Sequence, residues 1–190
     1  ARAGLKPGDM QLAEVHDAFG RVRVVEMGEY RFLEFGDAVE QSCVFTADPA
    51  WLEYDYTRGM LLGALLHESA ETALFLGLGA GNLTQCCLKF LALDDVEVIE
   101  LRPDVPRLAM QFLGLTDDPR LTIRIGDAAY EVCEVRGGRL VTCGATSGHQ
   151  ASLDLRHLFA RQLSMLGSYM GAKGELLQAY AHVQEAWALY

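Results

Sequence analysis

The sequence has little of several features that would assign it to a familiar class of protein. No apolar run approaches the roughly 20 residues that cross a bilayer, so we expect no membrane span or membrane partner. Its five cysteines form no CxxC pair and no even disulfide framework, so we expect no metal site and a reducing, cytoplasmic setting. The first nine residues include no apolar segment of the signal-peptide kind, so secretion is not expected.

Positive charge is also scarce and scattered. There are 16 lysines and arginines against 26 acidic residues, which gives a formal net charge of −10. Proteins that bind the phosphate backbone usually carry a clustered basic surface, so we expect no nucleic-acid partner. An acidic surface favours cationic small molecules instead.

The residues that are present suggest strands first and then alternating strands and helices. The segments 21–26 and 30–35 alternate apolar and polar residues around a turn at Gly28-Glu29, which predicts a β-hairpin or small meander between Phe19 and Phe45. Apolar residues at helical spacing predict a helix over Trp51–His67, with Asp48 as a cap. We therefore divide the chain into an N-terminal β-hairpin part and a nucleoside-binding domain, residues 1–50 and 51–190.

The centre of the chain has the order of a nucleotide-binding unit. An apolar run, Leu74–Leu76, leads into Gly77-Leu78-Gly79-Ala80-Gly81, and helical spacing follows from residue 82 to about 93. Two further strands are expected at 96–99 and 121–125, with a helix at 104–112 between them. This alternation predicts an α/β fold, a Rossmann-like, doubly wound, mainly parallel sheet flanked by helices.

Five residues of this unit are candidates for ligand binding. Gly77, Gly79 and Gly81 permit a tight turn and close approach of a ligand to a helix N-terminus. Glu100 ends the next strand 19 residues after Gly81, where a carboxylate can accept from both ribose hydroxyls. Asp127 ends the third strand, where it can accept from an adenine amino group. The structural alternatives are a ligand-free turn, a solvated strand end and a helix cap.

The dinucleotide pattern GxGxxG, counted from Gly77, requires its third glycine at position 82, and this position is Asn82. This spacing favours an S-adenosyl nucleoside and makes NADP the less favoured cofactor.

Four motifs resemble one enzyme family, namely Leu76–Gly81, Val98–Leu101, Asp117–Leu121 and Gly126–Ala128. With the β-hairpin part, residues 14–128, about 60% of the chain, resemble the spermidine synthase (polyamine aminopropyltransferase) family. The resemblance implies that the glycines and Glu100 hold decarboxylated S-adenosylmethionine, that Asp127 faces the adenine and that Gln41 borders the site. A surface or packing role for Gln41 is the alternative. Tyr54 or Tyr56 corresponds to an active-site tyrosine of the family.

The sequence departs from this family after Ala128. The family continues with a helix and a strand of the form Tyr-Asp-x-Ile-x-x-Asp, whose last acid is the general base, and no such strand lies between Asp127 and Gly138. We therefore name no catalytic residue. His157 and the Ser147-Gly148-His149 segment have no identifiable catalytic partner.

Residues 136–178 instead resemble the cofactor domain of zinc-type medium-chain alcohol dehydrogenases and quinone oxidoreductases, as does Ala1–Asp9 faintly. This predicts a chimera spliced near residues 132–137. Its expected elements are strands at 138–144 and 163–168 and helices at 157–162 and 175–189.

Three functional hypotheses follow. The leading one is a spermidine synthase-like protein of polyamine biosynthesis, a transferase if active, that binds decarboxylated S-adenosylmethionine or methylthioadenosine and a polyamine. The alternatives are an NAD(P)-binding fragment of a medium-chain dehydrogenase and an engineered, non-catalytic chimera. Trp187 and Tyr190 either close the core or meet a partner subunit, which leaves a homodimer open.

Overall fold

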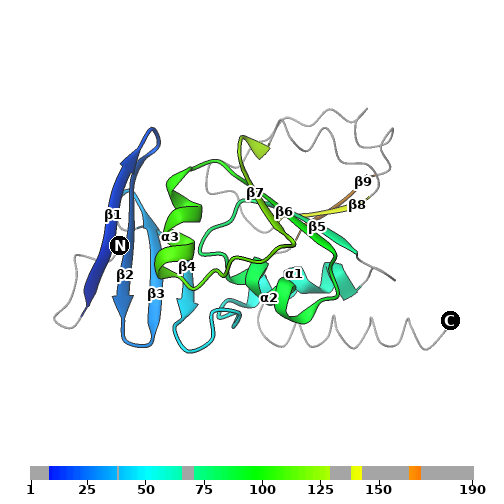
Figure 1. The fold of residues 1–190 in the computed structure, drawn as a ribbon, viewed down its shortest axis with the longest axis horizontal. Coiled ribbons are helices and arrows are strands. Elements are labelled where there is room, and N and C mark those ends of the chain that lie inside the picture. The colour runs from blue at the N-terminus through cyan, green and yellow to red at the C-terminus, as the bar shows by residue number, and fades with distance from the viewer. Residues whose placement is uncertain (1–8, 38, 66–70, 129–137, 143–162, 168–190) are drawn as a thin grey trace. The chain divides into compact units, whose positions relative to one another are not determined.

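The computed structural model describes residues 9–37, 39–65, 71–128, 138–142 and 163–167, and Figure 1 shows their helices and strands. The chain divides into two compact units. The first comprises Ala1–Glu53 and Ala70–Glu131, and the second comprises Tyr54–Ser69 and Val132–Tyr190. All six candidate binding residues belong to the first unit.

The first unit begins with an antiparallel sheet. Its strands pair in sequence order and are β1 (Met10–Asp17), β2 (Gly20–Met27), β3 (Tyr30–Phe35) and β4 (Val39–Phe45). The predicted hairpin is therefore confirmed and extends to a four-stranded meander. The strand β1 was not predicted, because a bulge between Gln11 and Ala13 interrupts the alternation on which the prediction depends.

A parallel sheet follows in the same unit. Its strands β5 (Thr72–Leu76), β6 (Asp95–Glu100) and β7 (Leu121–Ile125) pair in that order, and α2 (Asn82–Phe90) and α3 (Asp104–Phe112) connect them. The central strand is buried on both faces, at Val96, Val98 and Ile99, as parallel strands covered by helices usually are. The predicted α/β fold with a Rossmann-like parallel sheet is confirmed.

The helix α3 joins the two sheets. Its buried residues Val105, Leu108 and Ala109 belong to the same apolar cluster as Val22 of β2 and Val98 of β6. Figure 1 shows α3 between the antiparallel and the parallel sheet. This shared core fixes the antiparallel sheet beside the carboxyl edge of the parallel one.

The helix expected over Trp51–His67 begins later than predicted, since α1 spans Asp55–Leu65, and His67 lies outside the described residues. The proposed cap, Asp48, stabilises a turn instead. Its Oδ1 accepts from the amide of Ala50 at 3.1 Å, and its carbonyl accepts from the amide of Trp51 at 2.9 Å. Trp51 is thus part of a turn, and its apolar spacing gave the wrong start for the helix.

The second unit contains α1 and a pair of parallel strands, β8 (Gly138–Thr142) and β9 (Leu163–Gly167). Both strands were expected, and the predicted last residues, Cys143, Gly144 and Ser168, lie outside the described residues. The helices predicted at 157–162 and 175–189 lie outside the described residues. Among the helices that the structure describes, none has the length and apolar character needed to span a bilayer.

Candidate functional site

The glycine loop, Gly77–Gly81, joins β5 to α2 and has an unusual backbone. Gly77, Gly79 and Gly81 have φ angles of 94°, 58° and 82°, a region that residues with a side chain rarely adopt. The amide of Gly77 donates to the Ile99 carbonyl at 2.8 Å, which fixes the start of the loop against β6. The turn itself therefore requires glycine at all three positions, and ligand binding has to be argued from the neighbouring side chains.

Close packing is a second reason for two of these glycines. A Cβ atom on Gly79 would lie 3.1 Å from Ser42 Oγ, and one on Gly81 would lie 3.2 Å from Leu115 Cδ1. Both distances are shorter than ordinary van der Waals contact. The loop is therefore packed tightly between β4 and the segment that follows α3.

Strand β4 holds the loop through polar contacts that the sequence did not reveal. The amide of Ala80 donates to Ser42 Oγ at 2.7 Å, and Asn82 Nδ2 donates to the Cys43 carbonyl at 3.3 Å. Ser42 and Asn82 are both buried. The antiparallel sheet thus contacts the glycine loop directly. The hydrogen bond between Ser42 and Ala80 joins residues 38 positions apart in the sequence.

Ser42 offers a test of this support. Replacing Ser42 with alanine leaves the buried Ala80 amide without its acceptor, so we expect the free energy of unfolding in urea to fall by about 1–3 kcal/mol. Thr46→Ala is the matched control, because its hydroxyl donates to the Glu29 carbonyl in an exposed position. We expect the control to change stability by less than about 0.5 kcal/mol. Equal stability of the two variants would show that Ser42 does not hold the loop.

Gln41 lies beside Ser42 at an irregular point of β4. Leu33 pairs with Ser42 and Glu34 pairs with Glu40, so Gln41 is the extra residue of a bulge. Bulges often occur next to functional sites, where they redirect a side chain. The Gln41 Nε2 donates to the Val39 carbonyl at 3.4 Å, a long hydrogen bond. The structure thus places Gln41 next to a residue that contacts the loop, and its role at the site stays a prediction.

Glu100 is the buried acid of the site. It ends β6 and is 6% exposed. Its Oε2 accepts from the amide of Leu78 in the glycine loop at 2.8 Å, and its Oε1 accepts from the amide of Arg102 at 2.9 Å. Each carboxylate oxygen has a further lone pair, so the fixed carboxylate can still accept from a pair of hydroxyls.

Asp127 follows β7 at the same edge of the parallel sheet. The amide of Gly126 donates to the Glu100 carbonyl at 3.0 Å, which ties the end of β7 to the end of β6. Asp127 itself is exposed, and Ala128 is helical. The structure thus brings the glycine loop, Glu100 and the backbone before Asp127 to one edge, while the predicted contact of Asp127 with adenine stays a prediction.

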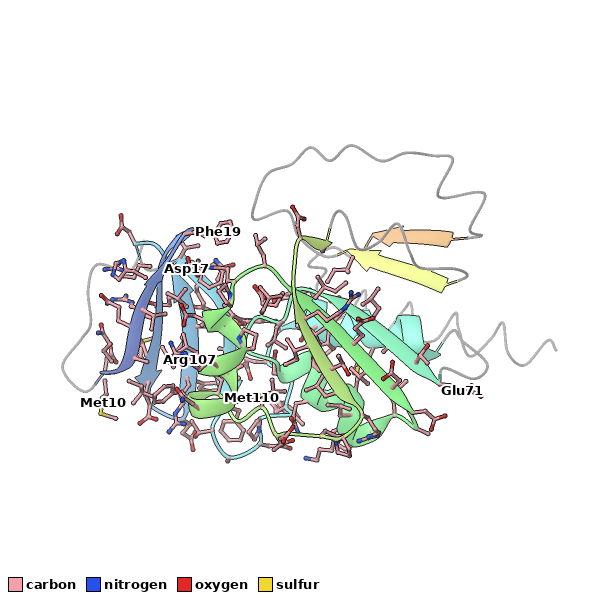
Figure 2. All side chains as sticks on the ribbon, turned by 45° about the horizontal axis from the view of Figure 1, so that its top comes forward. Met10, Asp17, Phe19, Glu71, Arg107 and Met110 are labelled. Atoms are coloured by element: carbon pink, nitrogen blue, oxygen red, sulfur yellow. The ribbon has the colours of Figure 1, made fainter. Side chains whose placement is uncertain are left out.

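Arg102 is a further residue whose role the sequence analysis missed. It is 5% exposed and forms an ion pair with Asp17, whose carboxylate is buried as well. The hydrogen bond from Arg102 holds the pKa of Asp17 below its usual value, so the pair is charged at neutral pH. Figure 2 labels Asp17 and Phe19 at the β1–β2 turn, which approaches the end of β6 through this contact.

The other residues that the sequence analysis considered belong to the second unit or lie outside the described residues. The rings of Tyr54 and Tyr56 stack with centroids 5.6 Å apart, and both belong to the second unit. Ser147, His149 and His157 lie outside the described residues. Cys43 is buried beside the loop, and desolvation raises the pKa of its thiol to about 12, so it is not a thiolate nucleophile at neutral pH.

The first unit combines an antiparallel sheet with a Rossmann-like parallel sheet. Comparison with solved structures finds a similar fold in spermidine synthases. A spermidine synthase in complex with the transition state analogue AdoDATO has a TM-score of 0.54 and 19% identity, over 67% of this chain and 44% of that chain. The spermidine synthase of Thermotoga maritima has a TM-score of 0.56 and 22% identity, over 67% and 44%.

A probable spermidine synthase from Corynebacterium glutamicum has a TM-score of 0.57 and 17% identity, over 77% of this chain and 55% of that chain. The present chain thus spans about half the length of these proteins. No family model and no curated protein matches it. At this level of identity, the likeness demonstrates a shared fold and carries no further conclusion about activity.

Proposed function

We propose that the first unit binds an adenine nucleoside of the S-adenosyl type, decarboxylated S-adenosylmethionine or methylthioadenosine. The observation that carries the proposal is the Glu100 carboxylate, which is buried at the end of β6 and hydrogen-bonded to the Leu78 amide of the glycine loop. A carboxylate held at this edge is suited to accept hydrogen bonds from the two ribose hydroxyls, with the adenine toward Asp127. The similarity to spermidine synthases, one of them in complex with AdoDATO, supports this choice of ligand.

The proposal extends to an aminopropyltransferase-like role in polyamine biosynthesis, with an amine as the second ligand. The acidic net charge of the chain favours a cationic partner of that kind. In such a reaction, proximity aligns the amine nitrogen with the carbon beside the sulfonium. The nitrogen bonds to that carbon as the carbon–sulfur bond breaks and methylthioadenosine leaves, and a base removes the amine proton. Asp127 is already assigned to the adenine, so we assign the base to no residue.

The arrangement favours a nucleoside over NADP. A 2′-phosphate on the ribose would lie close to the negatively charged Glu100. Proteins that accept this phosphate usually place an arginine near it, whereas the Arg102 guanidinium donates two hydrogen bonds to Asp17 and a third to the Gly20 carbonyl. The cation nearest to Glu100 in the sequence is thus already engaged.

Thermal unfolding tests the choice of ligand. A ligand present at 100 times its dissociation constant adds about 2.7 kcal/mol to stability, so we expect methylthioadenosine to raise the unfolding midpoint more than NADPH at matched concentrations. A larger shift with NADPH would contradict the proposal and favour an oxidoreductase fragment. No shift with either ligand would leave the fold without the proposed nucleoside site.

A second candidate is a recombined chain whose second unit derives from a dehydrogenase cofactor domain. Two observations favour it. The second unit resumes at Val132, inside the junction expected at residues 132–137, and it contains the parallel pair β8 and β9, which fall in the dehydrogenase-like segment. The same titration, repeated with Glu100→Gln, tests this candidate. An NADPH site in the second unit would give the same rise in unfolding midpoint in the variant as in the wild-type protein.

A further inference from the structure

The Arg102 side chain points from the end of β6 into the antiparallel sheet. Its Nε donates to Asp17 Oδ2 at 2.8 Å, and its Nη2 donates to Asp17 Oδ1 at 2.6 Å and to the Gly20 carbonyl at 2.7 Å. The side chains of Arg102 and Asp17 are each 7% exposed. This two-point contact fixes the direction of the guanidinium as well as its distance.

Two aromatic rings, Phe35 of β3 and Phe19 of the β1–β2 turn, restrict the guanidinium further. Its central carbon lies 4.3 Å from the centroid of the Phe35 ring and 6.0 Å from that of Phe19. A guanidinium within about 6 Å of a ring is attracted by the ring electrons. Hydrogen bonds to Asp17 and contact with Phe35 therefore leave Arg102 little freedom.

The backbone of Arg102 is the part that contacts the candidate site. Its amide donates to Glu100 Oε1 at 2.9 Å, while its carbonyl accepts from the amide of Val105 at 3.1 Å at the start of α3. The other oxygen of Glu100 accepts from Leu78. A continuous set of hydrogen bonds thus runs from Asp17 through Arg102 and Glu100 to the glycine loop.

We infer that the Asp17–Arg102 ion pair is a positioning device that sets the orientation of the Glu100 carboxylate for the ribose. The inference rests on the proposed function, since the ribose is the ligand named there. It makes the β1–β2 turn a functional part of the nucleoside site, although Asp17 and Arg102 lie 85 residues apart and Arg102 reaches Glu100 through its backbone amide.

The chemistry of the pair supports positioning over simple stabilisation. Burying two charges costs free energy that their attraction often only balances, and a well-packed apolar pair is commonly as stable. A charged, bidentate pair does fix one geometry. Arg102 lies two residues after Glu100, and its backbone amide donates to the Glu100 carboxylate. Fixing the Arg102 side chain therefore also fixes the orientation of that carboxylate.

The test compares Asp17→Asn with a matched control, Glu34→Gln. Glu34 also forms a buried pair in the antiparallel sheet, since its Oε2 accepts from Arg23 Nε at 2.6 Å. We expect Asp17→Asn to weaken methylthioadenosine binding about tenfold in calorimetry, and Glu34→Gln to change it less than about twofold. In a Glu100→Gln background, Asp17→Asn should cause no further loss, because the pair acts through Glu100.

Amide hydrogen exchange in the free protein supplies a readout that needs no ligand. We expect the Leu78 and Arg102 amides to exchange faster in Asp17→Asn but not in Glu34→Gln. Arg102→Lys, which keeps the charge but loses the bidentate contact, should show the same effects and replaces Asp17→Asn if that variant does not fold.

The outcomes separate the inference from the proposed function. Unchanged affinity and exchange in Asp17→Asn would overturn the positioning role, as would an equal loss of affinity in Glu34→Gln. A wild-type protein that binds no methylthioadenosine would overturn the proposed function. In that case, faster exchange at Leu78 in Asp17→Asn alone would still support the positioning of Glu100, and equal exchange in both variants would overturn it.

Discussion

Replacement of Glu100 with glutamine is expected to weaken methylthioadenosine binding by about 1.5–3 kcal/mol, or roughly 10- to 150-fold. The carboxylate accepts one backbone amide at each oxygen, from Leu78 and from Arg102. A glutamine side chain has only one oxygen, so its NH₂ group would face one of these donors. The variant loses the charge that strengthens hydrogen bonds from the ribose and also disturbs the orientation of the side chain.

Calorimetry with methylthioadenosine and its 2′-deoxy analogue measures this effect. The wild-type protein should prefer the intact ribose, and Glu100→Gln should lose most of that preference. Glu97→Gln is the control, since Glu97 lies on the same strand in a half-exposed ion pair with Arg124 and should change little. Unchanged affinity in Glu100→Gln would remove Glu100 from the binding site.

The part of the site that could be predicted from the sequence depends on the order of neighbouring strands and turns along the chain. A glycine-rich turn after one strand and an acid at the end of the next must meet when the two strands are parallel neighbours, because their carboxyl ends lie at one edge. The hydrogen bond between the Leu78 amide and Glu100 Oε2 at 2.8 Å is the result of that arrangement. The helix at 104–112 and the strand at 121–125 were predicted with the same bounds, since their apolar periods are regular.

The contacts that were missed join residues far apart in the chain. Nothing in the spacing of Ser42 and Ala80, or of Asp17 and Arg102, marks them as partners. They meet because α3 packs the antiparallel sheet against the parallel one through a shared core. Sequence periodicity predicts which face of an element is buried, but not which polar groups on two packed elements meet.

The second large effect concerns catalysis, for which we expect no enzyme-like turnover. The spermidine synthase family places its general base at the end of a strand that follows the segment matching Asp127, and here no aspartate occurs between Asp127 and Asp154. The strand β8 (Gly138–Thr142) contains no acidic residue. A general base contributes about 10²–10⁴-fold, so a chain that only positions the nucleoside should transfer the aminopropyl group slower than a working enzyme by about that factor.

The measurement is the release of methylthioadenosine from decarboxylated S-adenosylmethionine and putrescine, followed by chromatography. Working enzymes typically turn over at about 10 s⁻¹, so we expect a rate of about 0.1 s⁻¹ or less. Glu100→Gln is the control, because at subsaturating substrate it should lower a residual rate that arises at this site at least about tenfold and leave one from a contaminating enzyme unchanged. A Glu100-dependent rate of about 1 s⁻¹ or more would contradict the prediction. A residue other than Asp127 would then supply the base, and His149 and His157 would be the first candidates for substitution.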